Sequence, residues 1–184
     1  MNPNIKEEWL TSRNWFDYHG LYEWAANMPF KKYVEVGSWK GHSISFLAQI
    51  IVQAQVKTDY EIYAVDLWEN SKMSDTQVPE LPYIHEIFTE NLTRAGVREH
   101  VKDLKMSSVE ASKLFKDKSL DFVFIDADHS YESVKEDITH WKPKLKPGCV
   151  LAGHDYYAPG VKRAVQQLIS TYDLFGPCWV TKCL

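Results

Sequence analysis

The stretch VEVGSWKGHS (residues 34–43) decides the fold of this chain. The apolar run Tyr33–Val36 leads into a loop with two glycines, Gly37 and Gly41, and a helical pattern begins near Ser43. A strand, a glycine loop and a helix in this order are typical of the first unit of a parallel α/β sheet. Ligands of such sheets bind beyond the carboxyl ends of the strands, so we expect this loop to border a binding site.

Short apolar runs and helical patterns alternate along the rest of the chain, as they do in βαβ units. The strands predicted after residue 36 are 62–65, 101–106, 122–125 and 150–152. The predicted helices are 43–55, 83–95, 108–115, 131–141 and a last one from Pro159 to near Thr171. Residues 174–177 and 179–181 predict a closing hairpin. The predicted fold is α/β: a doubly wound, Rossmann-like sheet, mostly parallel with an antiparallel C-terminal strand.

Length and charge limit the class of protein. The 184 residues fit a single domain (1–184), with residues 1–30 as an N-terminal helical cap and residues 31–184 as its core. Within the cap, residues 15–28 have the pattern of an amphipathic helix. The 21 basic and 25 acidic side chains leave a net charge of -4 without a basic stripe, so nucleic acid ranks low as a partner.

Hydropathy and cysteine usage predict a cytoplasmic protein without a membrane partner. The longest apolar-rich stretch, 44–56, is interrupted by polar side chains and is too short to span a bilayer. The first eight residues lack the apolar segment of a signal peptide. The three cysteines, Cys149, Cys178 and Cys183, lack the spacing of a zinc or redox motif, which fits a reducing compartment.

Several segments have weaker patterns. Residues 69–82 are polar and contain proline, which predicts a loop over the site, and residues 146–148 (Lys-Pro-Gly) predict a turn into the last parallel strand. Lys40 and His42 are interpreted as solvated loop residues. Exposed aromatic side chains near the N-terminus would form the interface of a homo-oligomer; the candidates are Trp9, Trp15 and Phe16.

The spacing of the two glycines separates this loop from the dinucleotide-binding fingerprint, which needs three. A tight strand-to-helix turn without a ligand is a second interpretation of the loop. One βαβ unit later, Asp66 follows the predicted strand 62–65, where an acid can accept hydrogen bonds from both hydroxyls of a ribose. Asp66 could also cap a loop or helix. Leu67 and Trp68 would place an apolar surface beside an adenine ring, although Trp68 also suits the core.

Three acidic residues follow the last two parallel strands. Asp126 and Asp128 lie just past strand 122–125, and Asp155 lies just past strand 150–152, so all three should share one sheet edge with Asp66. Carboxylates that meet there repel one another unless a cation neutralises them or a pKa is raised. Oxygen ligands suit Mg²⁺, and a histidine among them shifts the preference toward Mn²⁺. Asp126, His129 and His154 could instead be ordinary polar loop residues.

From Tyr33 to Leu168 the chain resembles class I S-adenosylmethionine-dependent methyltransferases. Within that class it is most similar to the macrocin-type and other sugar O-methyltransferases. The loop 34–43 is specific only to the class, whereas the pair Asp-Ala-Asp-His-Ser-Tyr (126–131) and Gly-His-Asp-Tyr (153–156) is far more specific. The turn 141–148 between them, Trp-Lys-Pro-Lys-Leu-Lys-Pro-Gly, belongs to the same resemblance.

The resemblance implies a role for each of the site residues. Glu35, Gly37 and Gly41 would shape the site for the amino-acid end of S-adenosylmethionine, Asp66 would bind its ribose, and Ser107 and Ser108 would contact its adenine. The predicted cofactor site is completed by Ser38, Ser43, Leu67, Trp68 and Asp126. In related metal-dependent members, the positions of Asp126, His154 and Asp155 bind a divalent cation, and that of Asp128 is the general base. His154 stands where those enzymes carry a carboxylate, a departure that bears on the metal site.

The sequence therefore predicts an O-methyltransferase acting on a hydroxyl of a small molecule, of sugar or phenol type. A divalent cation, Mg²⁺ or Mn²⁺, would lower the pKa of the acceptor hydroxyl, and Asp128 or His154 would accept its proton. A non-catalytic module that binds S-adenosylmethionine or S-adenosylhomocysteine is a second reading. A metal-dependent hydrolase ranks last, because it would leave Gly37, Gly41 and Asp66 without a role.

Overall fold

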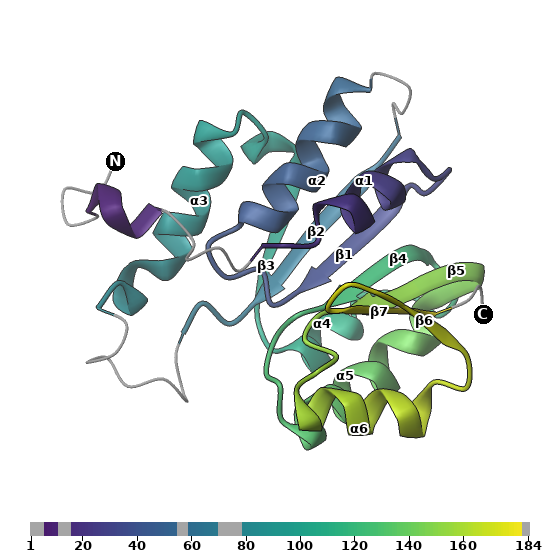
Figure 1. Ribbon diagram of the computed structural model, residues 1–184. Coiled ribbons are helices and arrows are strands. Elements are labelled where there is room, and N and C mark those ends of the chain that lie inside the picture. Colours follow the sequence, from purple (N-terminus) through teal and green to yellow (C-terminus); the bar gives the residue numbers. More distant parts are fainter. Residues whose placement is uncertain (1–5, 11–15, 55–58, 70–78, 182–184) are drawn as a thin grey trace.

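The computed structural model describes residues 6–10, 16–54, 59–69 and 79–181. A seven-stranded sheet in the order β3-β2-β1-β4-β5-β7-β6 forms the centre of the molecule (Figure 1). Its strands are β1 (Lys32–Val36), β2 (Glu61–Asp66), β3 (Val101–Lys105), β4 (Leu120–Ile125), β5 (Leu145–Gly153), β6 (Tyr172–Phe175) and β7 (Cys178–Thr181).

The strand directions confirm the predicted α/β sheet. Strands β1 to β5 are parallel, and β7 pairs antiparallel with both β5 and β6, so the predicted hairpin closes the sheet. The strand order reverses between β1 and β4, which lie side by side but are far apart in sequence. In doubly wound sheets this reversal opens a crevice at the carboxyl ends of the strands.

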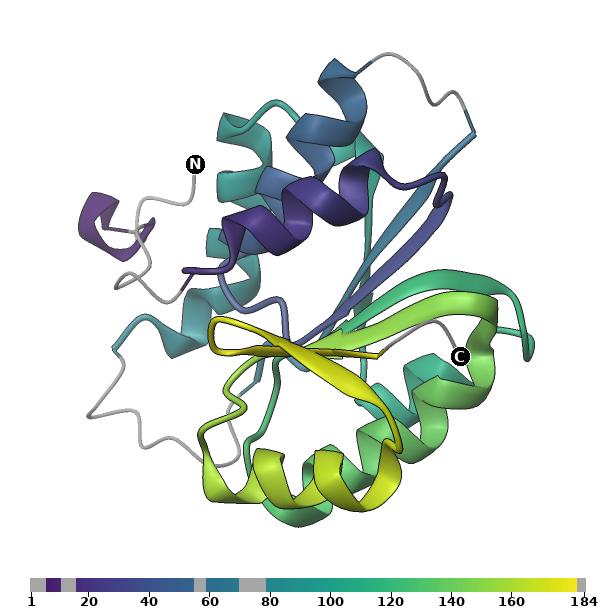
Figure 2. The ribbon, with the colours of Figure 1, turned by 45° about the vertical axis from the view of Figure 1, so that its right-hand side comes forward.

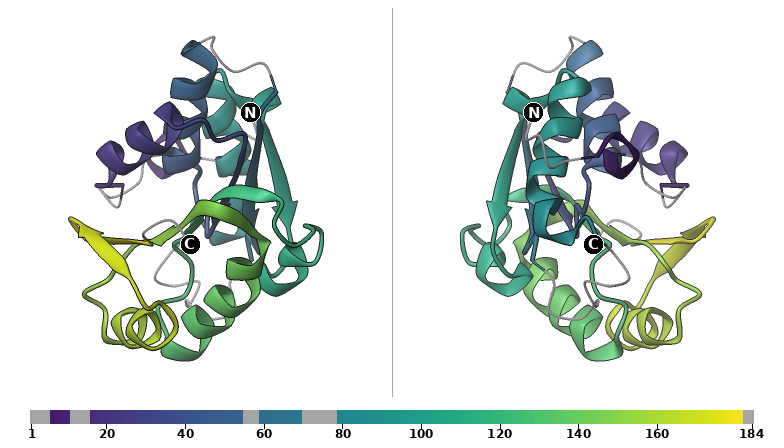
Figure 3. Two further views of the ribbon diagram at one scale, coloured as in Figure 1. Left: turned by 90° about the vertical axis from the view of Figure 1, so that its right-hand side faces the viewer. Right: turned by 90° about the vertical axis from the view of Figure 1, so that its left-hand side faces the viewer.

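Helices cover both faces of the sheet (Figures 2 and 3). One face carries α1 (His19–Asn27), α2 (His42–Gln53) and α3 (Ile84–Arg94), and the other carries α4 (Ser108–Ser112), α5 (Tyr131–Trp141) and α6 (Pro159–Leu168). Short 3-10 turns occupy η1 (Glu7–Leu10), η2 (Leu81–Tyr83), η3 (Arg98–His100) and η4 (Lys142–Lys144). Because successive side chains of a strand point to opposite faces, Tyr33 and Phe122 pack under α1 and α2, while Val34 and Val123 pack on the α5 side.

Two sequence expectations about the fold are wrong. Residues 146–148 are not a turn ahead of β5 but part of it: the pairing with β4 jumps from Leu145 to Val150, and Gly148 has a φ of 81°. The extra residues therefore make the pairing of β5 with β4 irregular. Proline and glycine favour such an irregular strand as well as a turn, so their pattern alone does not separate the two. Helices α4 and α6 also end earlier than predicted, at Ser112 and Leu168.

The N-terminal segment packs into the core of the domain. Tyr22 and Ala25 of α1 are fully buried, and α1 lies against α2. Phe16, predicted to be exposed at an interface, is partly buried against this core, with its ring 5.3 Å from that of Phe46. Trp15, the side chain of Trp9, Cys183 and most of the predicted loop 69–82 lie outside the described residues. Among the helices that are described, none has the length and apolar character needed to cross a bilayer.

Candidate active site

A cavity of about 830 Å³ lies at the carboxyl ends of β1, β2, β4 and β5. Most of the residues predicted for the site line this cavity, although they come from segments that are far apart in the sequence. They are Gly37, Ser38, Gly41, Ser43, Asp66, Leu67, Ser107, Ser108, Asp126, Asp128, His154 and Asp155. Glu35 and Trp68 do not line it. The topology therefore brings the residues predicted to bind the methyl donor and those predicted to act on the methyl acceptor into one cavity.

Packing within the protein requires both glycines of the loop. Gly37 and Gly41 have φ values of 89° and 78°, in the left-handed region that favours glycine. A Cβ at Gly37 would lie 2.1 Å from the backbone oxygen of Asp126. A Cβ at Gly41 would lie 2.7 Å from side-chain atoms of Phe88 and Leu92 on α3. The glycines thus let β1 turn against the end of β4 and let α2 begin against α3.

Asp66 ties the glycine loop to the end of β2. Its Oδ2 accepts the backbone N–H of Trp39 at 2.9 Å, and its Oδ1 accepts that of Trp68 at 2.9 Å. Burial raises the pKa of the Asp66 carboxyl, although these backbone hydrogen bonds oppose the shift. Each carboxylate oxygen keeps a second lone pair, so Asp66 can hold the loop and still accept a ligand hydroxyl.

Trp68 is a core residue and not the predicted neighbour of an adenine ring. Its side chain is 4% exposed, and its ring packs against those of His85 and Phe88 at 4.5 and 4.6 Å. Its indole Nε1 donates to the backbone oxygen of Trp39 at 2.8 Å. The adjacent Leu67 lines the cavity and is 45% exposed, so it supplies the apolar surface there.

Lys40 is buried and is not the solvated loop residue that the sequence predicts. Its Nζ lies 2.9 Å from Oε1 of Glu80, and the side chains of the pair are 5% and 11% exposed. A buried cation needs such a partner, because an unpaired charge away from water is costly. The ion pair joins the glycine loop to the chain just ahead of α3, and the charge of Lys40 is neutralised inside the cavity wall.

Glu35 lies below the cavity. It is 1% exposed, and its Oε2 accepts the hydroxyl proton of Tyr22 at 2.5 Å. The hydroxyls of Ser38 and Ser43, both on the wall of the cavity, also hydrogen-bond to the Glu35 carboxyl. Burial raises the pKa of Glu35 to about 7, although the Tyr22 hydrogen bond opposes the shift. A carboxyl with this pKa is half protonated at neutral pH.

We expect the Glu35→Gln variant to gain stability relative to the wild type as the pH rises from 4.5 to 8. In the folded wild type the pKa of Glu35 is about 7, above the ordinary 4.5, so the folded state binds the proton more tightly than the unfolded state. The wild type therefore loses unfolding free energy as the pH rises from 4.5 to 8, whereas the glutamine variant has no proton to lose. The shift corresponds to about 3 kcal/mol, and urea unfolding of both proteins at both pH values measures it. An unchanged difference in unfolding free energy would contradict the elevated pKa.

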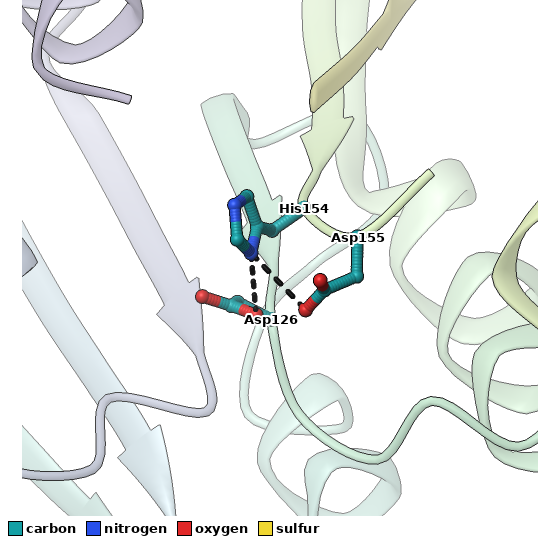
Figure 4. A group of neighbouring side chains, drawn as sticks. All are labelled: Asp126, His154 and Asp155. Carbon is teal, nitrogen blue, oxygen red and sulfur yellow. Dashed lines mark hydrogen bonds and ion pairs between the residues drawn. The ribbon is translucent and has the colours of Figure 1, made fainter. Parts of the chain in front are cut away.

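At the carboxyl ends of β4 and β5, the side chains of Asp126, His154 and Asp155 lie close together and form the acidic edge of the sheet (Figure 4). His154 Nδ1 lies 3.5 Å from Asp126 Oδ1 and 3.1 Å from Asp155 Oδ2, and one ligand atom from each residue falls within 4.8 Å of the others. His129 Nε2 lies 3.0 Å from the same Asp155 oxygen. Asp155 has a φ of 52°, a strained backbone of the kind found at functional sites. The candidate ligand atoms are two carboxylate oxygens and one imidazole nitrogen, a set that suits a divalent cation.

The two imidazoles neutralise the carboxylates of this edge. Burial alone would raise the pKa of Asp126, but hydrogen bonds with His129 and His154 outweigh it and lower that pKa. The pKa of Asp155 is lowered mainly by its hydrogen bond with His154. Burial would lower the pKa of His154, yet the bonds to Asp126 and Asp155 raise it to about 10. The repulsion expected from the sequence is therefore relieved by imidazolium, without a raised carboxyl pKa.

Asp128, Ser107 and Ser108 also have partners within the protein. The carboxylate of Asp128 accepts the backbone N–H of Ser130 at 2.7 Å, at the mouth of the loop that starts α5. Ser107 is the N-cap of α4. Ser108 Oγ donates to the buried carboxylate of Asp137 and accepts the indole N–H of Trp141 at 2.8 Å. The serines predicted to face adenine thus help to build the wall of the cavity.

Sequence reasoning missed two residues of the site, Asp17 and Tyr18. Both lie just before α1 and line the cavity. Asp17 Oδ1 lies 3.0 Å from His154 Nε2, and the Tyr18 hydroxyl donates to Asp126 Oδ2 at 3.0 Å. These partners are more than 100 positions apart in the chain, so no local pattern could have linked them.

Comparisons with known proteins agree with this architecture. A family described as a methyltransferase domain matches residues 34–156. The uncharacterized protein y4gI of Sinorhizobium fredii (strain NBRC 101917 / NGR234) is 28% identical over 156 residues, which is 79% of this chain. The chain spans only 16% of the length of that relative.

Solved structures share the fold at low identity. The O-methyltransferase NovP is 17% identical with a TM-score of 0.66, covering 90% of this chain and 78% of its own. The O-methyltransferase TomG from Streptomyces achromogenes, solved with S-adenosylmethionine, is 16% identical with a TM-score of 0.66 over 90% and 79% of the two chains. CalS11, a TDP-rhamnose 3'-O-methyltransferase, is 14% identical with a TM-score of 0.63 over 89% and 77%. Since the family match covers more than half of the chain, the chain belongs to the methyltransferase domain family.

Proposed function

We propose that this domain binds S-adenosylmethionine in the cavity and transfers its methyl group to a hydroxyl of a small molecule, of sugar or phenol type. The observation that carries the proposal is the layout of one cavity wall. The glycine loop, Asp66 and Leu67 lie at the ends of β1 and β2, and the Asp126–His154–Asp155 cluster lies at the ends of β4 and β5.

The residues of the cavity fit this cofactor. A volume of about 830 Å³ is within the range of small-molecule sites. Ser38 is buried in the cavity wall, where its hydroxyl can contact a polar group of the ligand as well as Glu35. Asp66 would accept from the ribose hydroxyls, and Leu67 would cover one side of the base. Trp68 takes no part in this proposal because it belongs to the core.

The transfer itself needs a proton acceptor and a neutralising charge. The acceptor oxygen attacks the methyl carbon, the C–S bond breaks with its electron pair going to sulfur, and the hydroxyl proton leaves to a base. We assign Asp128 as that base, because it lines the cavity as a carboxylate. His154, with a pKa raised to about 10 by Asp126 and Asp155, carries the proton at neutral pH and would stabilise the developing alkoxide instead of removing its proton.

Asp126, His154 and Asp155 also fit a divalent cation, Mg²⁺ or Mn²⁺. His154 would have to release its Nδ1 proton to act as a ligand, so affinity for the cation should rise with pH. When bound, such a cation lowers the pKa of a coordinated hydroxyl and holds it in place. Asp126, Asp155 and the neutral imidazole of His154 would then hold the cation together.

Equilibrium binding tests the donor site. Calorimetry should detect S-adenosylmethionine and S-adenosylhomocysteine, and a complete lack of binding would contradict the proposal. A labelled methyl group supplied with a set of hydroxylated sugars and phenols should then appear on an acceptor. Binding without transfer to any acceptor would favour the non-catalytic module.

Mn²⁺ is expected to raise the melting temperature of the wild type, and the Asp155→Ala variant is expected to lose this response. A ligand that binds only the folded state stabilises it in proportion to its saturation, so removal of one of three ligands should abolish the shift. The control is Asp117→Ala, which removes an equally charged, exposed side chain paired with Lys144. If Asp155→Ala and Asp117→Ala respond to Mn²⁺ as the wild type does, the assignment of the cation site is wrong.

We also propose that the domain works in the cytoplasm on small molecules and not on nucleic acid. Cys178 is a buried free thiol, which a reducing compartment preserves. The cavity is rich in carboxylates, and its Lys40 is already paired with Glu80. Phosphate groups of a nucleic acid would therefore meet repulsion at this surface.

A further inference from the structure

The segment just before α1 crosses the acidic edge of the sheet. Phe16, Asp17 and Tyr18 line the cavity together with the ends of β4 and β5. The segment is anchored by α1 itself, because Tyr22 is fully buried and donates to Glu35 at the end of β1. Asp17 and Tyr18 are thus held beside the Asp126–His154–Asp155 cluster, in contact with His154 and Asp126.

Asp17 pairs with the ring nitrogen of His154 that faces away from the cluster. A carboxylate can only accept, so at 3.0 Å the His154 Nε2 must donate its proton to Asp17 Oδ1. The other ring nitrogen, Nδ1, then points to Asp126 and Asp155, at 3.5 and 3.1 Å. The His154 side chain is 11% exposed, so the ring has little freedom to turn away from this arrangement. In metal sites a carboxylate behind a ligating histidine has this effect on tautomer and orientation.

Tyr18 does the same for Asp126. It is 3% exposed, and its hydroxyl donates to Asp126 Oδ2 at 3.0 Å. This leaves Oδ1 of Asp126 facing His154 Nδ1 and His129 Nε2, at 3.5 and 3.8 Å. The Tyr18 ring also packs 4.8 Å from the His154 ring and 4.7 Å from that of Phe124, which limits movement of the imidazole.

We infer that Asp17 and Tyr18 are positioning residues, which orient His154 Nδ1 and Asp126 Oδ1 as a preformed ligand pair for a divalent cation. The inference rests on the cation site in the proposed function. It adds that the N-terminal segment completes the part of the cavity proposed to hold the methyl acceptor. This segment lies outside the matched family region of residues 34–156. Neither residue need touch the cation, because each acts through the ligand behind which it lies.

The test is Mn²⁺ affinity, measured from the electron paramagnetic resonance signal of free Mn²⁺ in titrations of the full chain. We expect Asp17→Ala to weaken binding by about 10- to 100-fold, the range found when the partner of a metal-bound histidine is removed. Tyr18→Phe keeps the ring and removes only the hydroxyl, and it should weaken binding in the same sense. Asp17→Asn keeps an oxygen acceptor for Nε2–H and should restore most of the affinity. S-adenosylhomocysteine affinity, measured by calorimetry, should fall by less than Mn²⁺ affinity in each of them.

A charge-matched control separates orientation from electrostatics. Asp59→Ala removes an exposed carboxylate that pairs with Lys31, and it should leave Mn²⁺ affinity unchanged. Equal losses in Asp17→Ala and Asp17→Asn, or wild-type affinity in Asp17→Ala, would overturn the inference. A wild type that binds S-adenosylhomocysteine but not Mn²⁺ would also overturn it and leave the donor site intact. A wild type that binds Mn²⁺ alone would remove the donor proposal, and the variants would still decide the roles of Asp17 and Tyr18.

Discussion

Gly37→Ala is expected to destabilise the domain by more than about 3 kcal/mol and to abolish S-adenosylhomocysteine binding. The added Cβ would lie 2.1 Å from the Asp126 backbone oxygen and 2.7 Å from the Ala127 Cα. These neighbours are backbone, and the ends of β1 and β4 are joined there by the Asp126 N–H, which donates to the Val36 oxygen at 2.8 Å. The loop and Asp126 must therefore separate, and both border the cavity.

Gly96→Ala is the matched control for this prediction. Gly96 has a φ of 72°, close to that of Gly37, but no atom lies within 4 Å of the Cβ that alanine would add. Gly96→Ala should lower the free energy of unfolding only by the cost of a left-handed alanine, about 1–2 kcal/mol, and should leave ligand affinity unchanged. Urea unfolding and calorimetry of both variants provide the comparison. Equal losses of stability in the two variants would show that the contact with Asp126 does not restrict residue 37.

Asp66→Ala is expected to weaken S-adenosylhomocysteine binding by about 100-fold, which corresponds to about 2.7 kcal/mol. The substitution removes the proposed acceptor for the ribose hydroxyls. It also leaves the backbone N–H groups of Trp39 and Trp68 without their partner, which costs about 1–3 kcal/mol for each buried group. The glycine loop then loses its tie to β2, so affinity and stability should fall together.

Asp121 offers a control with the same chemistry at the other end of the sheet. It lies at the start of β4, and its Oδ2 accepts the backbone N–H groups of Lys31 and Lys32 at 3.0 and 2.9 Å. Asp121→Ala should lower the free energy of unfolding by a comparable amount and leave ligand affinity within about twofold. Calorimetry at equal folded fractions separates the two effects. Wild-type affinity in Asp66→Ala would place the ribose elsewhere.

Local patterns were sufficient to predict most of the sheet and the place of the site. The alternation of apolar runs with helical periods identifies the strands β1 to β5, because burial on a sheet face or a helix stripe depends on residues only a few positions apart. Parallel strands end at one edge, so Asp66, Asp126 and Asp155 could be placed together from their positions after three strands. All three line the cavity.

Contacts between distant parts of the chain decide the remaining features, and no local pattern records them. Trp68 follows a strand as an adenine neighbour would, but the proximity of His85 and Phe88 makes it a core residue. Gly37 is required because the end of β4 approaches it, a contact between residues far apart in the sequence.

The acidic cluster shows the same division at the site itself. Sequence position placed Asp126 and Asp155 at one edge, since each follows a parallel strand, and the family resemblance added His154. The charge on His154 and the direction of its Nδ1 depend on Asp17, Tyr18 and the two carboxylates, which only folding brings within hydrogen-bond reach. A side chain's residue type and strand position are properties of the chain, whereas its protonation and orientation are set by the neighbours that packing supplies.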